Sequence, residues 1–80
     1  MSSRINYPPE VESRINQGID MHLSGEKTYN CMSSICMSDE VALPEFSEFF
    51  RVCGMRMRRI AERMKRYQEV RGAHYSMSSD

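Results

Sequence analysis

The chain of 80 residues contains no tryptophan and only three phenylalanines, so few large aromatic side chains are available to fill a core. Eighty residues make one small domain at most, and a lone core of that size is marginally stable. Eight methionines supply soft, adaptable apolar surface in place of aromatic anchors. Because 40% of the residues are hydrophobic and 28% are charged, the composition is that of a globular chain and excludes a disordered one.

The chain also lacks a long apolar run. No hydrophobic segment opens it, and none approaches the length that spans a bilayer. Its three cysteines, Cys31, Cys36 and Cys53, are odd in number and do not have the spacing of metal ligands. Free thiols are typical of the reducing cytosol, so we expect a cytoplasmic protein.

Neither sign of charge is in excess, since eleven Lys and Arg balance eleven Asp and Glu. The distribution is uneven, because residues 51–66 contain seven basic side chains against Glu62 alone and the rest of the chain is acidic. This basic face predicts either a solvated surface or binding to an acidic partner. It lacks the interleaved aromatics that stack on bases, so nucleic acid is not implied. A membrane surface is not implied either, because methionine dominates the apolar side where membrane-bound helices usually carry Trp, Phe or Leu. The residues that we expect to contact an acidic partner are Arg58, Arg59, Arg63 and Arg66.

Hydrophobic periodicity predicts two long helices in an all-α fold. An extended arm over residues 1–8 precedes a helical hairpin over 9–72, with helices at about 9–37 and 44–71, and a flexible tail covers 73–80. The first helix places on one face Val11, Ile15, Ile19, His22, Glu26, Tyr29, Ser33 and Cys36. The second helix places on one face Phe46, Phe49, Phe50, Cys53, Met57, Ile60, Ala61, Met64 and Tyr67.

The short connection between these helices predicts an antiparallel hairpin. A hairpin has a single seam, whereas each helix has an apolar band wide enough to touch more than one neighbour. We therefore expect the hairpin to be half of a four-helix bundle, completed by two helices from a second copy or another chain.

Two side chains of the first helix are weak candidate metal ligands. His22 and Glu26 are four residues apart, so they lie on one helix face and could share an ion. Two ligands alone hold a metal poorly, and the alternative is a hydrogen-bonded polar pair at the seam. Tyr29, on the same face, is expected to be a packed aromatic.

Several short motifs have the order and spacing seen at the start of animal ferritin subunits. The most specific is Asp39-Glu40-Val41-Ala42-Leu43 followed by Phe46 and Phe49-Phe50, which resembles the turn between the first two helices of that bundle. The other matching motifs are Asn6-Tyr7, Ile15-Asn16, Tyr29, Ala61-Glu62, Gln68 and Arg71-Gly72. The resemblance implies a ferritin-like helix hairpin that forms the N-terminal half of the bundle in a truncated subunit.

The resemblance implies an iron-storage or iron-binding subunit, with other ferritin-type subunits or further copies of itself as partners. Heavy-type ferritin subunits also oxidise Fe(II) at a di-iron site built from carboxylates and an imidazole. The matching positions here are occupied by His22, Arg56, Met57 and Ile60. A thioether is a soft ligand and an aliphatic side chain is none, so no ferroxidase activity is expected. Iron is implied by the resemblance alone, because the positions of the nucleating glutamates also lack carboxylates and hold Val52, Met55, Arg56 and Arg59.

The sequence is compatible with two functions. The favoured one is a truncated ferritin-like subunit without its own oxidation site. The alternative is a small helical interaction module that binds an acidic partner through the basic face of residues 51–66.

Overall fold

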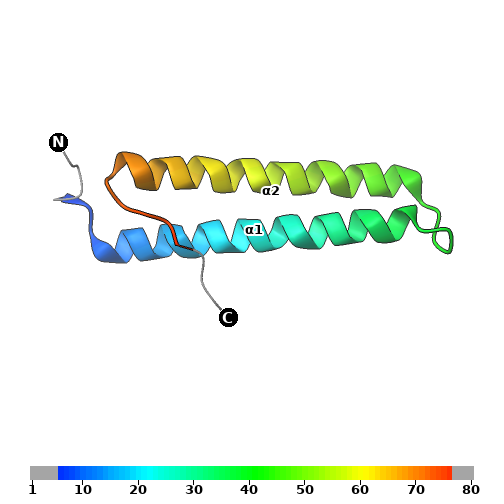
Figure 1. The fold of residues 1–80 in the computed structure, drawn as a ribbon, viewed down its shortest axis with the longest axis horizontal. Coiled ribbons are helices and arrows are strands. Elements are labelled where there is room, and N and C mark those ends of the chain that lie inside the picture. Colours follow the sequence, from blue (N-terminus) through cyan, green and yellow to red (C-terminus); the bar gives the residue numbers. More distant parts are fainter. Residues whose placement is uncertain (1–5, 77–80) are drawn as a thin grey trace.

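The computed structural model describes residues 6–76 and consists of two long helices that pack side by side in opposite directions (Figure 1). Helix α1 spans Pro9–Met37 and helix α2 spans Pro44–Val70. The principal extents are 54 × 23 × 13 Å, so the hairpin is a flat rod that is two helices wide and one helix thick. The all-α hairpin expected from the hydrophobic periodicity is confirmed, and it is consistent with half of a ferritin-type four-helix bundle.

Both helices begin at a proline. Pro9 and Pro44 occupy the first turn of α1 and α2, where the fixed φ of proline suits a helix and its missing N–H costs nothing. Carboxylates follow in each first turn, where they interact favourably with the positive end of the helix dipole, at Glu10, Glu12 and Glu45.

The connection between the helices is a tight turn over residues 38–43. Ala42 has a φ of 49°, in the left-handed region that a non-glycine residue enters at a cost of about 1–2 kcal/mol. Two backbone hydrogen bonds hold it there, from the Ala42 N–H to the Ser38 carbonyl at 2.8 Å and from the Leu43 N–H to the Cys36 carbonyl at 2.7 Å. The turn therefore brings α2 back directly along α1.

The seam between the helices contains few large side chains. Ile19 of α1 and Ala61 of α2 are completely buried at its centre. Next to them, a Cβ added to Gly18 would lie 2.6 Å from the terminal methyl carbon of Met64. The glycines that lower the intrinsic helix propensity of α1 thus leave room for methionine side chains of α2.

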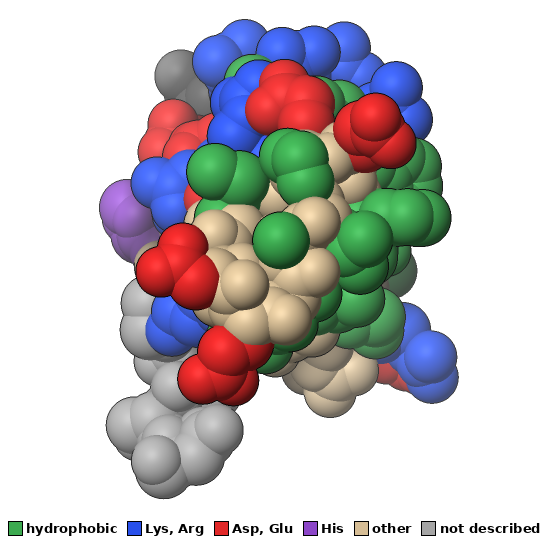
Figure 2. Space-filling model, turned by 90° about the vertical axis from the view of Figure 1, so that its right-hand side faces the viewer, with side chains coloured by type: hydrophobic (Ala, Val, Ile, Leu, Met, Phe, Trp, Pro, Cys, Tyr) green, Lys and Arg blue, Asp and Glu red, His purple; other side chains and the backbone are tan. Residues whose placement is uncertain are grey.

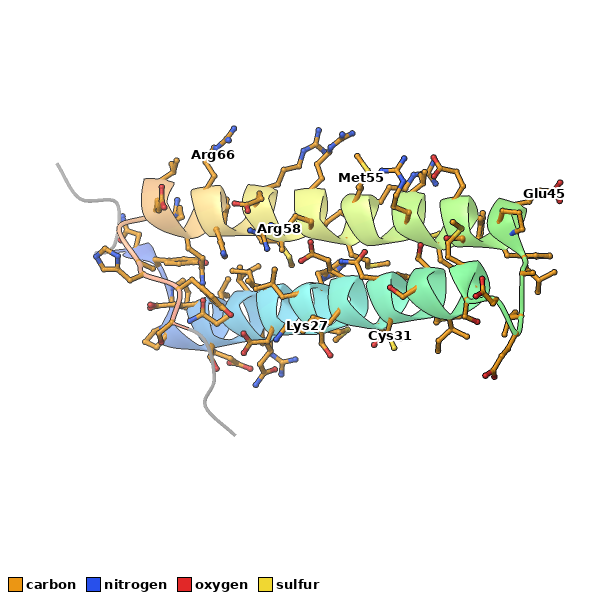
Figure 3. The ribbon with its side chains drawn as sticks, turned by 45° about the vertical axis from the view of Figure 1, so that its right-hand side comes forward. Lys27, Cys31, Glu45, Met55, Arg58 and Arg66 are labelled. Carbon is orange, nitrogen blue, oxygen red and sulfur yellow. The ribbon has the colours of Figure 1, made fainter. Side chains whose placement is uncertain are left out.

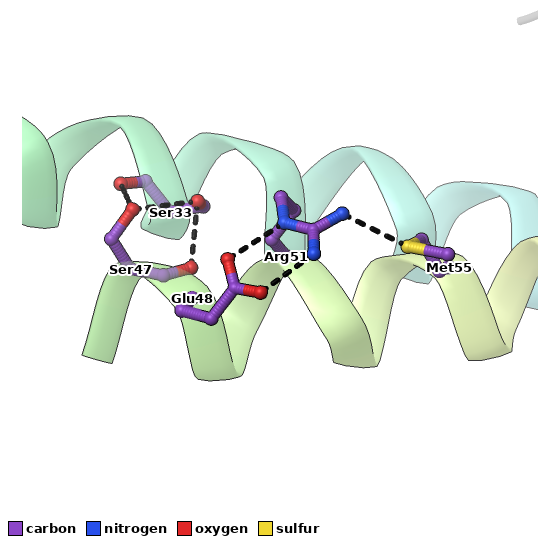
Figure 4. Close-up of polar contacts among 5 residues, drawn as sticks. All are labelled: Ser33, Ser47, Glu48, Arg51 and Met55. Carbon is purple, nitrogen blue, oxygen red and sulfur yellow. Dashed lines mark hydrogen bonds and ion pairs between the residues drawn. The ribbon is translucent and has the colours of Figure 1, made fainter. Parts of the chain in front are cut away.

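Polar side chains close the seam at both ends. Gln68 is 0% exposed; it accepts a hydrogen bond from the Tyr7 hydroxyl and donates to the Asn16 side-chain oxygen and the Glu12 carbonyl, both at 2.9 Å. At the other end, the hydroxyls of Ser33 and Ser47 each donate to the other residue's carbonyl at 2.8 Å (Figure 4). Ser33 belongs to the face expected from hydrophobic periodicity, whereas the periodicity did not identify the buried Ser47 and Gln68.

Residues 73–76 fall in the expected flexible tail, yet they fold back across α1 (Figure 1). Ala73 is buried, the Tyr75 hydroxyl donates to the Asp20 carboxylate, and the Lys65 ammonium lies 5.3 Å from the centre of the Tyr75 ring. The contacts of Tyr75 with Asp20 and Lys65 hold residues 73–76 against the helix pair. Residues 77–80 of the tail and 1–5 of the expected arm lie outside the described residues.

The contact between Tyr75 and Asp20 predicts an alkaline transition. The hydrogen bond to the carboxylate, desolvation and the negative charge together raise the pKa of Tyr75 from 10.0 to about 12. Because the folded chain holds this proton more tightly than the unfolded chain, the contact stabilises fully below pH 10 and is lost as the pH rises through 12. Ultraviolet titration of tyrosinate should show a step near pH 12 that disappears in Tyr75→Phe.

The control for this titration is Tyr67→Phe, which leaves the contact between Tyr75 and Asp20 intact. The late step should persist in that variant. A late step that survives Tyr75→Phe would show that the hydrogen bond does not form in solution.

A row of large apolar side chains on α2 has no cover. We define the apolar face as Phe46, Phe49, Ile60 and Tyr67, all of which are exposed. Their spacing puts them within about 60° of one direction around the helix. Figure 2 shows hydrophobic side chains gathered along one side of the molecule, with Lys and Arg side chains over the outer surface of α2. A two-helix pair can bury only one stripe, so four of the nine side chains expected on the buried face of the second helix remain on the surface.

Neither helix of the described region combines the length and the apolar character needed to cross a lipid bilayer.

Candidate functional site

The two candidate metal ligands of α1 already have partners within the hairpin. The Nδ1 atom of His22 lies 2.7 Å from the Gly18 carbonyl oxygen, which can only accept, so Nδ1 carries a proton and, in the neutral ring, Nε2 keeps its lone pair. Glu26 receives a hydrogen bond from Nη1 of Arg58 at 3.2 Å, and its side chain is half-buried.

These two residues also line different hollows. His22 lines an open groove of about 590 Å³ together with Tyr29 and Met57, whereas Glu26 lines a hollow on the side of Arg58 and Arg59. The structure therefore does not gather the predicted pair around one cavity. Within residues 6–76, no three His, Cys, Asp or Glu side chains are grouped closely enough to hold a metal ion.

The second-helix positions that match the ferritin di-iron ligands hold no oxygen donor. Met57 is half-buried, with its sulfur 3.4 Å from the place that a Gly25 Cβ would occupy. Arg56 and Ile60 are exposed. Fe(II) and Fe(III) in di-iron sites are held by carboxylates and imidazole, so the residues at these positions do not fit that centre.

Tyr29 is the packed aromatic that its place on the first-helix face predicts. Its ring stacks on Phe50 of α2, with the centres 6.2 Å apart and the planes at 24°. Stacking of this kind stabilises the pair beyond the area it buries. The ring forms one wall of the groove beside His22.

The four arginines predicted to contact an acidic partner have different environments. Arg58 points toward α1, whereas Arg66 points away from it (Figure 3). Arg58 is paired with Glu26 at 3.2 Å and with Glu62 at 3.0 Å. Arg59, Arg63 and Arg66 are exposed on α2, so three of the four remain accessible to a partner.

A further surface pair lies on the same helix. Arg51 contacts both carboxylate oxygens of Glu48, at 2.8 and 2.6 Å, and its Nη1 lies 3.1 Å from the sulfur of Met55 (Figure 4). The hydrogen bonds from Arg51 lower the pKa of Glu48 and raise that of Arg51. Both groups are solvated, so the pair orders the surface of α2 and contributes little to stability.

Sequence reasoning missed the full lining of the groove beside His22. The groove is lined by Met21, His22, Ser24, Gly25, Thr28, Tyr29, Met32 and Met57. Met21 and Met32 lie outside the expected first-helix stripe and were not considered. Their separation of eleven residues, close to three helical turns, is the signal that places them on one side of α1.

The fold defines this chain as an all-α helix hairpin of the kind that makes up half of a helical bundle. Over 74 residues it is 39% identical to the ferritin light chain of Oryctolagus cuniculus, a match that covers 90% of this chain and 42% of the relative. It is 39% identical over 70 residues to the soma ferritin of Lymnaea stagnalis, covering 88% and 40%. It is 34% identical over 70 residues to the chloroplastic ferritin of Malus baccata var. xiaojinensis, covering 88% and 28%.

These similarities confirm that the chain is ferritin-like over most of its length, as its motifs indicate. The chain spans about two fifths of the length of the light chain and of the soma ferritin. No family model matches it.

Proposed function

We propose that this chain is a ferritin-like iron-storage subunit that supplies a helix pair, and no oxidation site of its own, to a ferritin-type assembly. The observation that carries the proposal is the similarity to ferritin chains across both helices of the hairpin. In this proposal residues 9–72 contribute one helix pair, which packs against a second helix pair of a ferritin-type assembly. The free thiols are compatible with a cytoplasmic location.

The apolar face supports an assembly. Four large side chains, Phe46, Phe49, Ile60 and Tyr67, lie exposed along one side of α2. Fully burying a side chain of this kind stabilises by about 1.5–3 kcal/mol, so covering the row with two more helices is strongly favourable. In a four-helix bundle this is the side that meets the other pair.

The residues at the matching metal positions support a structural role without ferroxidase activity. Met57 offers a thioether and Ile60 offers no donor, while Arg56 adds a positive charge that repels cations. Iron handled by such an assembly would be oxidised at sites on other subunits.

Co-expression with a full-length ferritin tests this function. We expect the chain to elute with the large ferritin shells in size-exclusion chromatography. The purified chain alone should leave aerobic Fe(II) oxidation at the rate of buffer, because it lacks a carboxylate-bridged iron pair. Recovery of the chain only in small species, outside the shells, would contradict the proposal, as would oxidation well above the buffer rate.

The alternative of an acidic partner has less support. It rests on the exposed guanidinium groups of Arg59, Arg63 and Arg66, since Arg58 is already paired within the hairpin. Binding of that kind would weaken steeply with salt and be lost when these residues are replaced by glutamate.

A further inference from the structure

The groove beside the seam contains donors of a kind that iron does not favour. It lies near the middle of α1 and is lined by the thioethers of Met21, Met32 and Met57 and by the imidazole of His22. Within the described residues no three His, Cys, Asp or Glu side chains are grouped as a metal site, so thioethers are the additional donors that this groove offers. Thioether sulfur and imidazole nitrogen are ligands that suit Cu(I).

His22 has the geometry of a ligand held by a second partner. Its Nδ1 donates to the Gly18 carbonyl at 2.7 Å, which fixes the ring and leaves Nε2 as the basic nitrogen. Metal-bound histidines usually donate their other ring nitrogen in this way, because the bond orients the ring and makes the ligand more basic. The side chain is half-buried and lines the groove, so Nε2 is not used by the fold.

Gly25 brings the sulfur of Met57 close to the backbone of α1. The Sδ atom lies 3.4 Å from the position of a Cβ on Gly25, and the side chain is half-buried there. Met21 and His22 precede Gly25 by four and three residues, so they lie one turn away on the same face, at about 5–6 Å between Cβ positions. Three possible donors from two helices therefore line the same part of the groove.

Neighbouring groups do not complete a site for a hard cation. The Glu26 carboxylate is turned to the other side of the helix pair, where it binds Arg58. Met32 lies seven residues after Gly25, about 10 Å along the helix axis, and is too distant to share the same ion. The groove thus offers one nitrogen and two sulfur atoms, a donor set that favours a soft monovalent ion.

We propose that His22, Met57 and Met21 form a binding site for Cu(I) in the groove beside the seam. Nε2 of His22 and Sδ of Met57 are the ligands fixed by the fold. Met21 is 68% exposed, and its flexible side chain closes over the ion from the rim. No electron transfer is involved, since the metal binds as Cu(I). The inference does not depend on assembly with ferritin subunits.

The test uses Cu(I) without oxygen and Ag(I) as a redox-inert probe. Either ion is added to chain in which the three free cysteines are replaced and the methionine methyl groups are labelled. In nuclear magnetic resonance spectra the methyl signals of Met21 and Met57 and the ring signal of His22 should shift together. The methyl signal of Met55 should stay in place, because its sulfur lies on the outer side of α2 next to Arg51. Fe(II) should shift none of them. Shifts confined to other residues would overturn the proposal.

Variants of the proposed ligands, together with a control variant, test which side chains contribute to the affinity for Ag(I). Because Cys31, Cys36 and Cys53 are free thiols that bind the same ions, affinity is measured with Cys31 changed to serine and the other two to alanine. Met57→Leu and His22→Gln should each weaken Ag(I) binding at least about tenfold, the usual loss when the groups around a metal are disturbed. Met55→Leu, two residues away, should bind as the parent does. Equal affinity in all three variants would refute the site.

Discussion

Gln68→Leu should unfold most of the hairpin. Gln68 is completely buried and links Tyr7, Asn16 and the Glu12 carbonyl through three hydrogen bonds. Leucine keeps the volume but removes all three bonds and leaves the Asn16 oxygen without this donor, at a cost of about 2–4 kcal/mol. The free energy of unfolding of a two-helix chain of this size is little larger than this cost. The substitution should therefore leave most of the chain unfolded. Circular dichroism against urea measures the folded fraction, at a chain concentration high enough for the parent to be associated and helical.

The matched control is Gln17→Leu, which makes the same change on the exposed side of α1. This substitution should change the free energy of unfolding by no more than about 0.5 kcal/mol. Tyr7→Phe removes one hydrogen bond, so its loss of unfolding free energy should lie between those of Gln17→Leu and Gln68→Leu. If Gln68→Leu unfolds at the same urea concentration as Gln17→Leu, the network does not hold the ends of the helices together.

Replacing Phe46 and Phe49 with serine should abolish association of the chain. The parent hairpin leaves both rings exposed, Phe49 to 60%, and isolated helices owe most of their stability to packing. We therefore expect low helicity of the parent at micromolar concentration, rising as copies pair through the apolar face. If pairing buries about half of each exposed ring, losing both rings removes about 3 kcal/mol from the association, which becomes roughly a hundredfold weaker. Sedimentation and helicity over a concentration series measure both effects.

Met55→Ser is the control for this surface. Met55 is exposed to a similar degree, 48%, but lies on the side of α2 that carries Arg51 and Arg58. Its removal should leave the association unchanged. A parent chain that is fully helical and monomeric at every concentration would contradict the role given to the apolar face, and so would equal losses in both variants.

The ferritin-like hairpin was predictable from the sequence because its signals are local. Pro9 and Pro44 open the two helices, and the apolar spacing of α2 continues over six turns. The motif from Asp39 to Leu43 marks the turn. Hydrophobic periodicity also predicts which faces of a helix are apolar and suited to burial. It does not predict how many neighbouring helices are present to bury them. For that reason Phe49 and Ile60, expected in the core, are exposed here.

The candidate site was only partly predictable. The sequence places His22 and Glu26 on one face of α1, and this much follows from their spacing. Which partner each side chain meets depends on α2: Arg58 takes Glu26, while Met57 lies over Gly25 next to His22. No spacing within one helix predicts the register that brings residue 57 opposite residue 25.

The sequence by itself determined the all-α class of the chain, its resemblance to ferritin subunits and the absence of oxygen ligands at the matching iron positions. These depend on residue identity and on the period of a single helix. The tertiary structure alone decided that Gln68 is buried, that residues 73–76 return across α1 and that Met57 of α2 lies against Gly25 of α1. Such facts depend on contacts between segments far apart in the chain, because packing and register between helices decide which side chains meet.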